Sequence, residues 1–108
     1  MNKIPLWADA GGNYYLRLYQ FGTLKVWNGT NYVDNPAWAL TPITAVWNSA
    51  TGVYEAELPE GLPASRLYGV FYERAATDPA ITDERKVVRE FDWTGTQILP
   101  ENDSLRAV

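Results

Sequence analysis

Apolar and polar residues alternate along much of the chain with the two-residue period of a β-strand. In the segment 53–58, Tyr54, Ala56 and Leu58 alternate with Val53 and two glutamates. Successive side chains of a strand point to opposite faces, so this segment predicts a strand that buries its Tyr54, Ala56 and Leu58 face. Further strand patterns occupy residues 14–19, 24–26, 32–33, 44–47, 67–74 and 84–93, with a short one around Ile98. No window of eleven residues keeps helical spacing without an interrupting Gly or Pro, so regular helices are not expected.

Turn-forming residues separate these segments roughly every 8–12 residues. Asn28-Gly29 predicts a hairpin, because a tight two-residue turn needs positive φ at both central positions. Another turn is expected around Phe21-Gly22, and residues 48–52 are rich in turn formers. Two prolines within residues 35–42 cannot donate to a β-ladder, so this segment is expected to be an edge strand or a crossing between sheets.

The number and spacing of the strands are typical of an immunoglobulin-like sandwich or a small barrel. Tyr68 favours the sandwich, because it follows a tight loop at the start of a strand, as in a tyrosine corner whose hydroxyl bonds back to loop backbone. A plain core tyrosine is the alternative. The expected fold class is therefore all-β, an immunoglobulin-like two-sheet antiparallel β-sandwich of about seven strands.

Two of the predicted strands carry further information. Residues 67–74 are apolar on both faces, which indicates a central strand. In residues 84–93 the alternation breaks at Val87-Val88, so we expect a β-bulge that turns both valines toward apolar surroundings.

A chain of 108 residues has the size of one domain. We expect a single sandwich domain over 1–108, with its core at about 13–99 and a polar tail at 100–108. The apolar stretches are shorter than the roughly 18 residues of a membrane span, and residues 1–5 open no signal-peptide pattern. We therefore expect a soluble protein without an export signal or membrane partner, in the cytoplasm or a virion.

The composition removes most routes to catalysis. The chain has no Cys and no His, so it lacks thiolates and the side chain that titrates near neutrality. Thirteen acidic and nine basic residues give a net charge of −4, and the basic ones are scattered except for Arg85, Lys86 and Arg89. Phosphate binding needs clustered positive charge, so nucleic acid is not an expected partner. Neither an enzyme nor a cofactor is expected.

Carboxylates are the remaining candidates for chemistry. Glu55 and Glu57 share one strand face opposite the predicted core face, which favours a solvated surface over a glycosidase pair. Asp78, Asp83 and Glu84 do not follow the spacing of a calcium-binding loop, so no metal site is expected. Asp83 is instead predicted to cap its loop by accepting backbone N–H groups.

Aromatic residues are unusually frequent, with five Trp, seven Tyr and three Phe. They can fill the core of a thin sandwich or line a binding surface. Trp27 and Trp38 are the tryptophans expected to be partly exposed, where their rings would stack against sugars, and they are the candidate ligand-binding residues. Trp47 and Trp93 fit packing in the core or at a sheet edge.

The segment Phe91-Asp92-Trp93-Thr94-Gly95 is predicted to have a structural role, in which its two rings close the open end of the sandwich. Phe91 and Trp93 lie two residues apart and share the inner face, while Asp92 points the other way, toward loop N–H groups. Gly95 permits a turn that a side chain would obstruct.

Several motifs together resemble a short uncharacterised module of bacterial and tailed-phage or prophage proteins, some of them encoded near tail and virion genes. The motifs lie between about Tyr14 and Gly95, and Arg66-Leu67 stands where the pattern has Gly before Tyr68. They are Tyr15-x-Arg17, Val26-Trp27-Asn28-Gly29, Trp38, Gly52-Val53-Tyr54-x-x-x-x-Pro59, Leu62-Pro63-Ala64, Tyr68-x-Val70-x-Tyr72, Pro79-x-x-x-Asp83 and Phe91-Asp92-Trp93-x-Gly95. The resemblance implies a β-sandwich module without known catalysis.

These observations predict a non-enzymatic structural or interaction module, such as a component of a phage tail, virion or other surface assembly. Its expected partners are proteins, including further copies of itself. The alternative is a carbohydrate-binding module that uses exposed aromatic rings, with a glycan as the partner.

Overall fold

The computed structural model describes residues 3–34, 38 and 43–99. The predicted edge strand or crossing at 35–42, apart from Trp38, and the predicted tail at 100–108 lie outside the described residues. The described part contains no α-helix. Its strands are β1 (Lys3–Leu6), β2 (Tyr14–Gln20), β3 (Val26–Trp27), β4 (Tyr32–Val33), β5 (Ile43–Thr44), β6 (Val46–Asn48), β7 (Val53–Glu57), β8 (Ser65–Glu73), β9 (Glu84–Trp93) and β10 (Ile98–Leu99).

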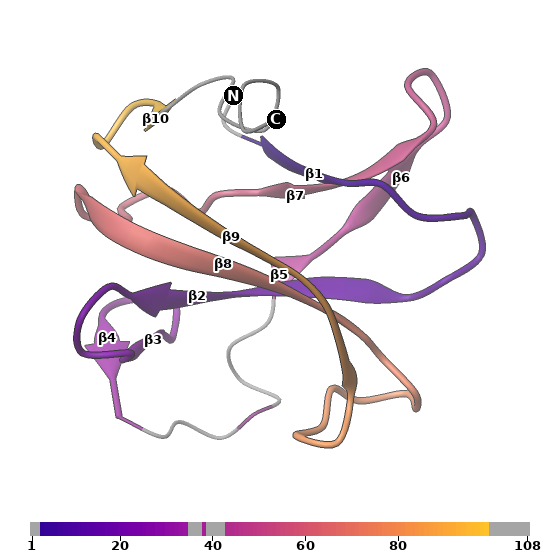
Figure 1. Ribbon diagram of the computed structural model, residues 1–108, viewed down its shortest axis with the longest axis horizontal. Helices are drawn as coiled ribbons and strands as arrows, with labels where there is room; N and C mark the ends of the chain where they lie inside the picture. Colours follow the sequence, from indigo (N-terminus) through magenta and orange to yellow (C-terminus); the bar gives the residue numbers. More distant parts are fainter. Residues whose placement is uncertain (1–2, 35–37, 39–42, 100–108) are drawn as a thin grey trace.

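The strands form two antiparallel sheets, the two layers of a β-sandwich (Figure 1). The small sheet has the order β1-β7-β6. The large sheet has the order β10-β9-β8-β2-β3-β4, and β5 pairs with β2. The all-β prediction is confirmed, and so is the central position of residues 67–74, because β8 lies between β9 and β2.

The core lies between the two sheets. Tyr54, Ala56 and Leu58 are 4%, 0% and 7% exposed, which confirms the buried face predicted for β7. Side chains from both sheets complete this core: Ile4, Leu6, Leu16, Leu18, Leu67, Phe71, Phe91 and Trp93.

Two strands differ from the sequence-based prediction because they depend on long-range pairing. Residues 44–47 do not form one strand, since the chain changes sheets at the buried Ala45, with β5 on β2 and β6 on β7. Strand β1 was not predicted, although Ile4 and Leu6 alternate with exposed residues. It contains a proline, which sheets tolerate at an edge, and β1 is an edge of the small sheet.

The Asn28-Gly29 hairpin is confirmed, but its turn is not the predicted tight type. The β3 strand pairs with β4, and the N–H of Asn28 donates to the carbonyl of Asn31 at 3.0 Å. Only Gly29 has positive φ, at 107°. The side-chain oxygen of Asn28 instead accepts the N–H groups of Thr30 and Asn31, each at 2.9 Å, and so holds a four-residue turn.

The predicted bulge at Val87-Val88 was placed wrongly. Phe71 pairs with Val87 and Tyr72 with Arg85, so Lys86 is the extra residue. Its ammonium group reaches Glu73 at 3.2 Å and Glu84 at 3.3 Å. Val87 and Val88 are 42% and 52% exposed and lie on opposite faces of β9, so they do not both turn toward the same apolar surroundings.

Candidate functional site

The outer face of the large sheet carries a regular array of tyrosines, which we call the tyrosine face. The strand register places its residues in rows that run across β9, β8 and β2. The rows are Arg85–Tyr72–Tyr15, then Val88–Val70–Arg17, then Glu90–Tyr68–Tyr19. Neighbouring rows are about 7 Å apart, because alternate residues of a strand share a face.

Trp38 covers the Tyr15 end of this face. The guanidinium carbon of Arg17 lies 3.6 Å from the centre of the Trp38 ring. The ring of Trp38 also meets Tyr72 edge-on at 5.2 Å, and Tyr72 stacks on Tyr15 at 5.5 Å. Arg17 is only 2% exposed, and a delocalised guanidinium against an aromatic ring is a favourable way to bury a positive charge.

Hydroxyl groups connect the covered end to the middle of the face. Arg17 donates to the hydroxyl of Tyr19 at 2.9 Å, and this oxygen lies 3.0 Å from the Tyr72 hydroxyl. Burial, together with the hydrogen bond to Tyr72, raises the pKa of Tyr19. The tyrosine therefore stays neutral and keeps its hydrogen-bonding proton under ordinary conditions.

Asp83 fixes the covered end from the loop between β8 and β9. It accepts the hydroxyl of Tyr15 at 2.5 Å and the N–H groups of Ala80 and Ala75 at 2.9 and 3.2 Å. Burial alone would raise the pKa of Asp83, but these hydrogen bonds and the nearby Arg74 hold it below its ordinary value. Burial, and next the hydrogen bond to Asp83, raises the pKa of Tyr15 to about 12.

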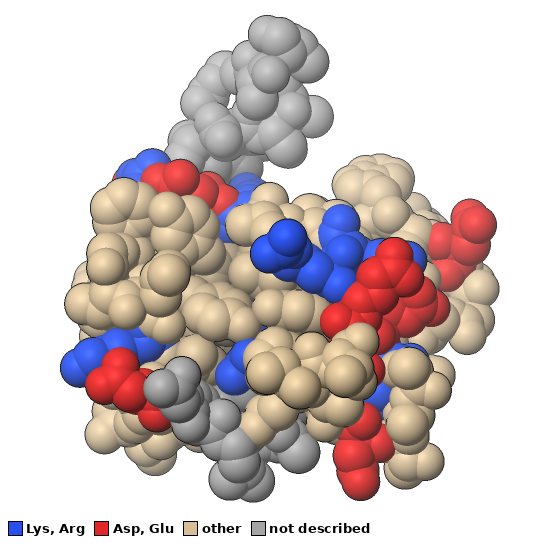
Figure 2. Space-filling model, turned by 60° about the horizontal axis from the view of Figure 1, so that its bottom comes forward, with Lys and Arg blue, Asp and Glu red and all other residues tan. Residues whose placement is uncertain are grey.

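The other end of the tyrosine face is an open groove of about 360 Å³. It is lined by Tyr19, Leu24, Tyr68, Val70, Tyr72, Arg85 and Val88. Leu24 is 61% exposed and Phe21, which stacks on Tyr68 at 5.5 Å, is 46% exposed. In Figure 2, charged side chains of both signs lie in adjacent groups, and much of the surface between them is uncharged. An apolar groove between charges of both signs suits a protein partner.

The structure corrects the prediction for Trp27. Its side chain is 4% exposed and packs edge-on against Tyr32, so it presents no ring face to solvent. Trp38 is half-buried between Arg17 and Tyr72. The two rings therefore do not form an exposed platform for sugars. The most exposed tryptophan is Trp7, at 80%. The sequence signal for its exposure was its position directly after the alternating buried residues Ile4 and Leu6 of β1.

The segment 91–95 has the predicted inner-face pair but a different role for its acid. Phe91 and Trp93 are 0% and 6% exposed, and the indole N–H of Trp93 donates to the carbonyl of Leu62 at 2.8 Å. Gly95 has φ of 101°. The expectation that Asp92 bonds loop N–H groups is wrong, because its two oxygens accept from Arg66 at 3.0 Å.

The tyrosine corner predicted at Tyr68 is also not observed. Tyr68 lies in the fourth position of β8 and points outward onto the tyrosine face, where it stacks on Phe21. Within the described residues its hydroxyl makes no hydrogen bond to loop backbone. The outward position follows from strand register, since Leu67 takes the inner face.

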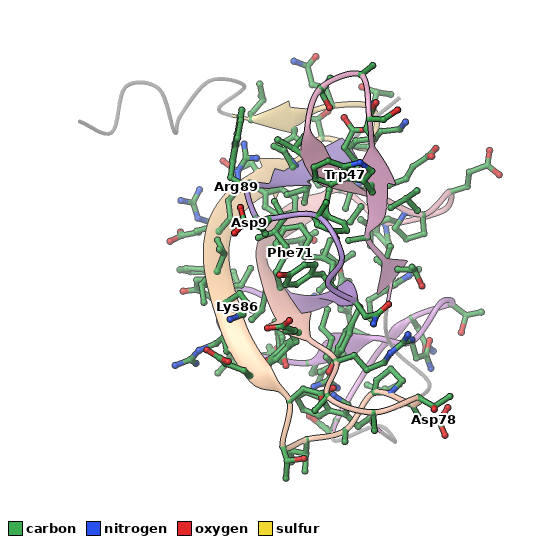
Figure 3. All side chains as sticks on the ribbon, turned by 90° about the vertical axis from the view of Figure 1, so that its right-hand side faces the viewer. Asp9, Trp47, Phe71, Asp78, Lys86 and Arg89 are labelled. Atoms are coloured by element: carbon green, nitrogen blue, oxygen red, sulfur yellow. The ribbon has the colours of Figure 1, made fainter. Side chains whose placement is uncertain are left out.

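The remaining acidic candidates lie apart from the tyrosine face. Glu55 accepts from the amide of Asn48 at 3.1 Å and lies 3.7 Å from the ammonium group of Lys3. Asp78 projects from the loop that Asp83 caps (Figure 3). In the part of the chain that the structure describes, no three acidic side chains gather in an arrangement that could hold a metal ion. Nor do the described residues include a helix suited to crossing a membrane.

No protein-family model, curated protein or solved structure matches this chain.

Proposed function

We propose that the protein is a non-enzymatic interaction module and that its tyrosine face binds a protein partner. The groove at the open end of this face carries the proposal. Tyr, Trp and Arg dominate the energetics of protein interfaces, and three tyrosines and an arginine line this groove. The covered end, fixed by Trp38 and Asp83, holds these side chains in place before a partner arrives, which lowers the entropic cost of binding.

The backbone of Leu24 supports a functional role for the groove. Leu24 has φ of 58°, and apart from glycines it is the only described residue with positive φ. A leucine in this left-handed region is strained by about 1 kcal/mol or more. This strained backbone conformation holds the apolar Leu24 side chain in solvent at the rim of the groove, and a bound partner would cover that side chain.

The strand order supports an immunoglobulin-like arrangement, which we include in the proposal. β1, β7 and β6 correspond to strands B, E and D of such a domain, while β9, β8 and β2 correspond to G, F and C. β3 and β4 then correspond to the added strands C′ and C″ of the variable type. The resemblance to phage and prophage modules supports placing the protein in a tail, virion or surface assembly.

Site-specific photocrosslinking in the cells that make the protein tests this proposal. Benzoylphenylalanine replaces Val88 in the groove or, as a control, the exposed Glu57 on the small sheet. We expect Val88-specific crosslinks to defined proteins, identified by mass spectrometry. Adding Leu24→Gly should lower their yield by about tenfold while the melting temperature does not fall, because glycine relieves the strained φ.

Equal crosslinking from positions 88 and 57 would overturn the proposal. So would a yield that Leu24→Gly leaves unchanged.

A further inference from the structure

The tyrosine face has charges of opposite sign in the rows on either side of a central valine pair. Val88 and Val70 pair across β9 and β8 in the middle row. Arg85 lies one row away on one side, and Glu90 lies one row away on the other. The bulge brings Arg85 into this position. In a regular strand Lys86 would pair with Tyr72, and the side chain at 85 would point to the other face.

From this array we propose that two copies of the chain pack with their tyrosine faces together, an inference that rests on the proposed function and names its partner. A two-fold axis lies across the strands, along the Val88–Val70 row. It sets β9 antiparallel to β9 of the second copy. The middle row then faces the same row of the second copy, and each outer row faces the opposite outer row. Arg85 of each copy then faces Glu90 of the other, and the Val88 side chains meet at the centre.

The charges favour a second copy over an unrelated partner. A two-fold interface uses the same patch twice, so the patch must be complementary to itself. This face meets that condition because its basic and acidic ends exchange places under the rotation. Across the described residues Arg85 makes no ion pair, so its charge is available.

Glu90 can accept a hydrogen bond from a second arginine while Arg66 of its own chain keeps an acidic partner. It accepts from Nε of Arg66 at 2.5 Å, but Nη1 of Arg66 also reaches both oxygens of Asp92. The carboxylate of Glu90 is exposed and offers more acceptor sites than this one bond uses. Arg85 of the second copy can therefore join it.

Sedimentation equilibrium of the full chain tests the proposal with a charge exchange. We expect the mass of the parent protein to rise from 12.2 kDa toward twice that value with concentration. Arg85→Glu and Glu90→Arg should each weaken self-association by about tenfold to a hundredfold, because each places like charges opposite one another. Mixed in equal amounts, the two variants should associate again, since one carries two acidic side chains along this line and the other two basic ones.

Arg89→Glu is the matched control, because it makes the same charge change on β9 from the opposite face. It should leave self-association unchanged, and melting curves should show all three variants folded. A mixture that stays monomeric, or a control that weakens association as much as Arg85→Glu, overturns the proposal. If the parent is monomeric throughout while Val88 still crosslinks other proteins, self-association is wrong and the proposed function stands. If Val88 also yields no specific crosslinks, both fail.

Discussion

Two buried charges hold the tyrosine face in shape, and each is compensated in a different way. Arg17 lies against the ring of Trp38 and donates to Tyr19. Asp83 accepts from a tyrosine hydroxyl and two backbone amides. Burying a charge is costly unless such partners are present, so both contacts specify one arrangement of the segments they join.

Replacing Asp83 with Asn should destabilise the protein in a pH-dependent way. The folded pKa of Asp83 lies below its ordinary value of 3.8, so its charge stabilises the fold above that pH. This contribution is lost as pH falls through the lower, folded pKa. We expect Asp83→Asn to reduce the free energy of unfolding by about 2 kcal/mol at pH 7, and the difference from the parent to shrink below pH 3.8.

Urea unfolding at pH 7 and pH 3 measures both effects. Asp78→Asn is the control, since Asp78 is an exposed acid in the same loop and should change stability little at either pH. A constant difference between Asp83→Asn and the parent at both pH values would show that the charge of Asp83 contributes nothing.

Local chemistry made some residues predictable from the sequence and left others out of reach. A loop-capping role for Asp83 follows from turn chemistry alone, and the structure shows the corresponding hydrogen bonds. The burial of Trp27 depends on a core built from residues far away in the chain, as does the outward direction of Tyr68. Both faces of β8 are apolar, so alternation could not say which of them meets the small sheet.

At the scale of elements, the inner face of the large sheet is closely packed around Gly69 in the middle of β8. A Cβ atom there would lie 3.2 Å from Leu16 Cδ1 and 3.2 Å from Phe91 Cε1. Leu16 and Phe91 are both 0% exposed, so they have little room to move. The sequence shows this glycine in a strand but not its neighbours, because those contacts arise only when β2, β8 and β9 pair.

Gly69→Ala should therefore destabilise the protein by about 1–3 kcal/mol, the usual cost of overpacking a core. This sign is informative, because Ala for Gly in an uncrowded strand is favourable. Urea unfolding measures the loss. In a Leu16→Ala background the obstructing Cδ1 is absent, so the same change should cost clearly less. An equal cost in both backgrounds would show that contact with Leu16 is not the cause.

For the whole molecule, the large sheet has an apolar cluster on each side. The main core packs Leu16, Phe71 and Phe91 against the small sheet. The second cluster contains Tyr15, Val70 and Tyr72, with Trp38 packed on it. β2 and β8 contribute to both clusters, so neither can form without the same backbone pairing, and we expect the described fold to unfold in one cooperative step.

The pattern of alternation was sufficient to predict the all-β class, because it needs only a count of strands and turns. It was not sufficient for the sheet assignment of residues 43–48. There the chain crosses from one sheet to the other at a single buried alanine, Ala45. The residues on either side of Ala45 have the same strand-like sequence pattern whichever sheet they join.

Trp93→Ala tests whether the whole fold depends on the main core. Trp93 is 6% exposed and bonded to the Leu62 carbonyl, so its loss should leave a cavity and an unpaired acceptor and cost about 3–5 kcal/mol. Trp7→Ala is the matched control, since Trp7 is 80% exposed and its loss should change stability by less than about 0.5 kcal/mol. Thermal unfolding of both variants is followed by far-ultraviolet circular dichroism, which reports the two sheets, and by tyrosine absorbance. Four of the seven tyrosines lie on the tyrosine face, so this face contributes much of the absorbance signal. Because β2 and β8 are shared, both signals of Trp93→Ala should move together to a lower temperature. A tyrosine signal that stays at the parent temperature while the circular dichroism falls would show that the tyrosine face is ordered independently of the core.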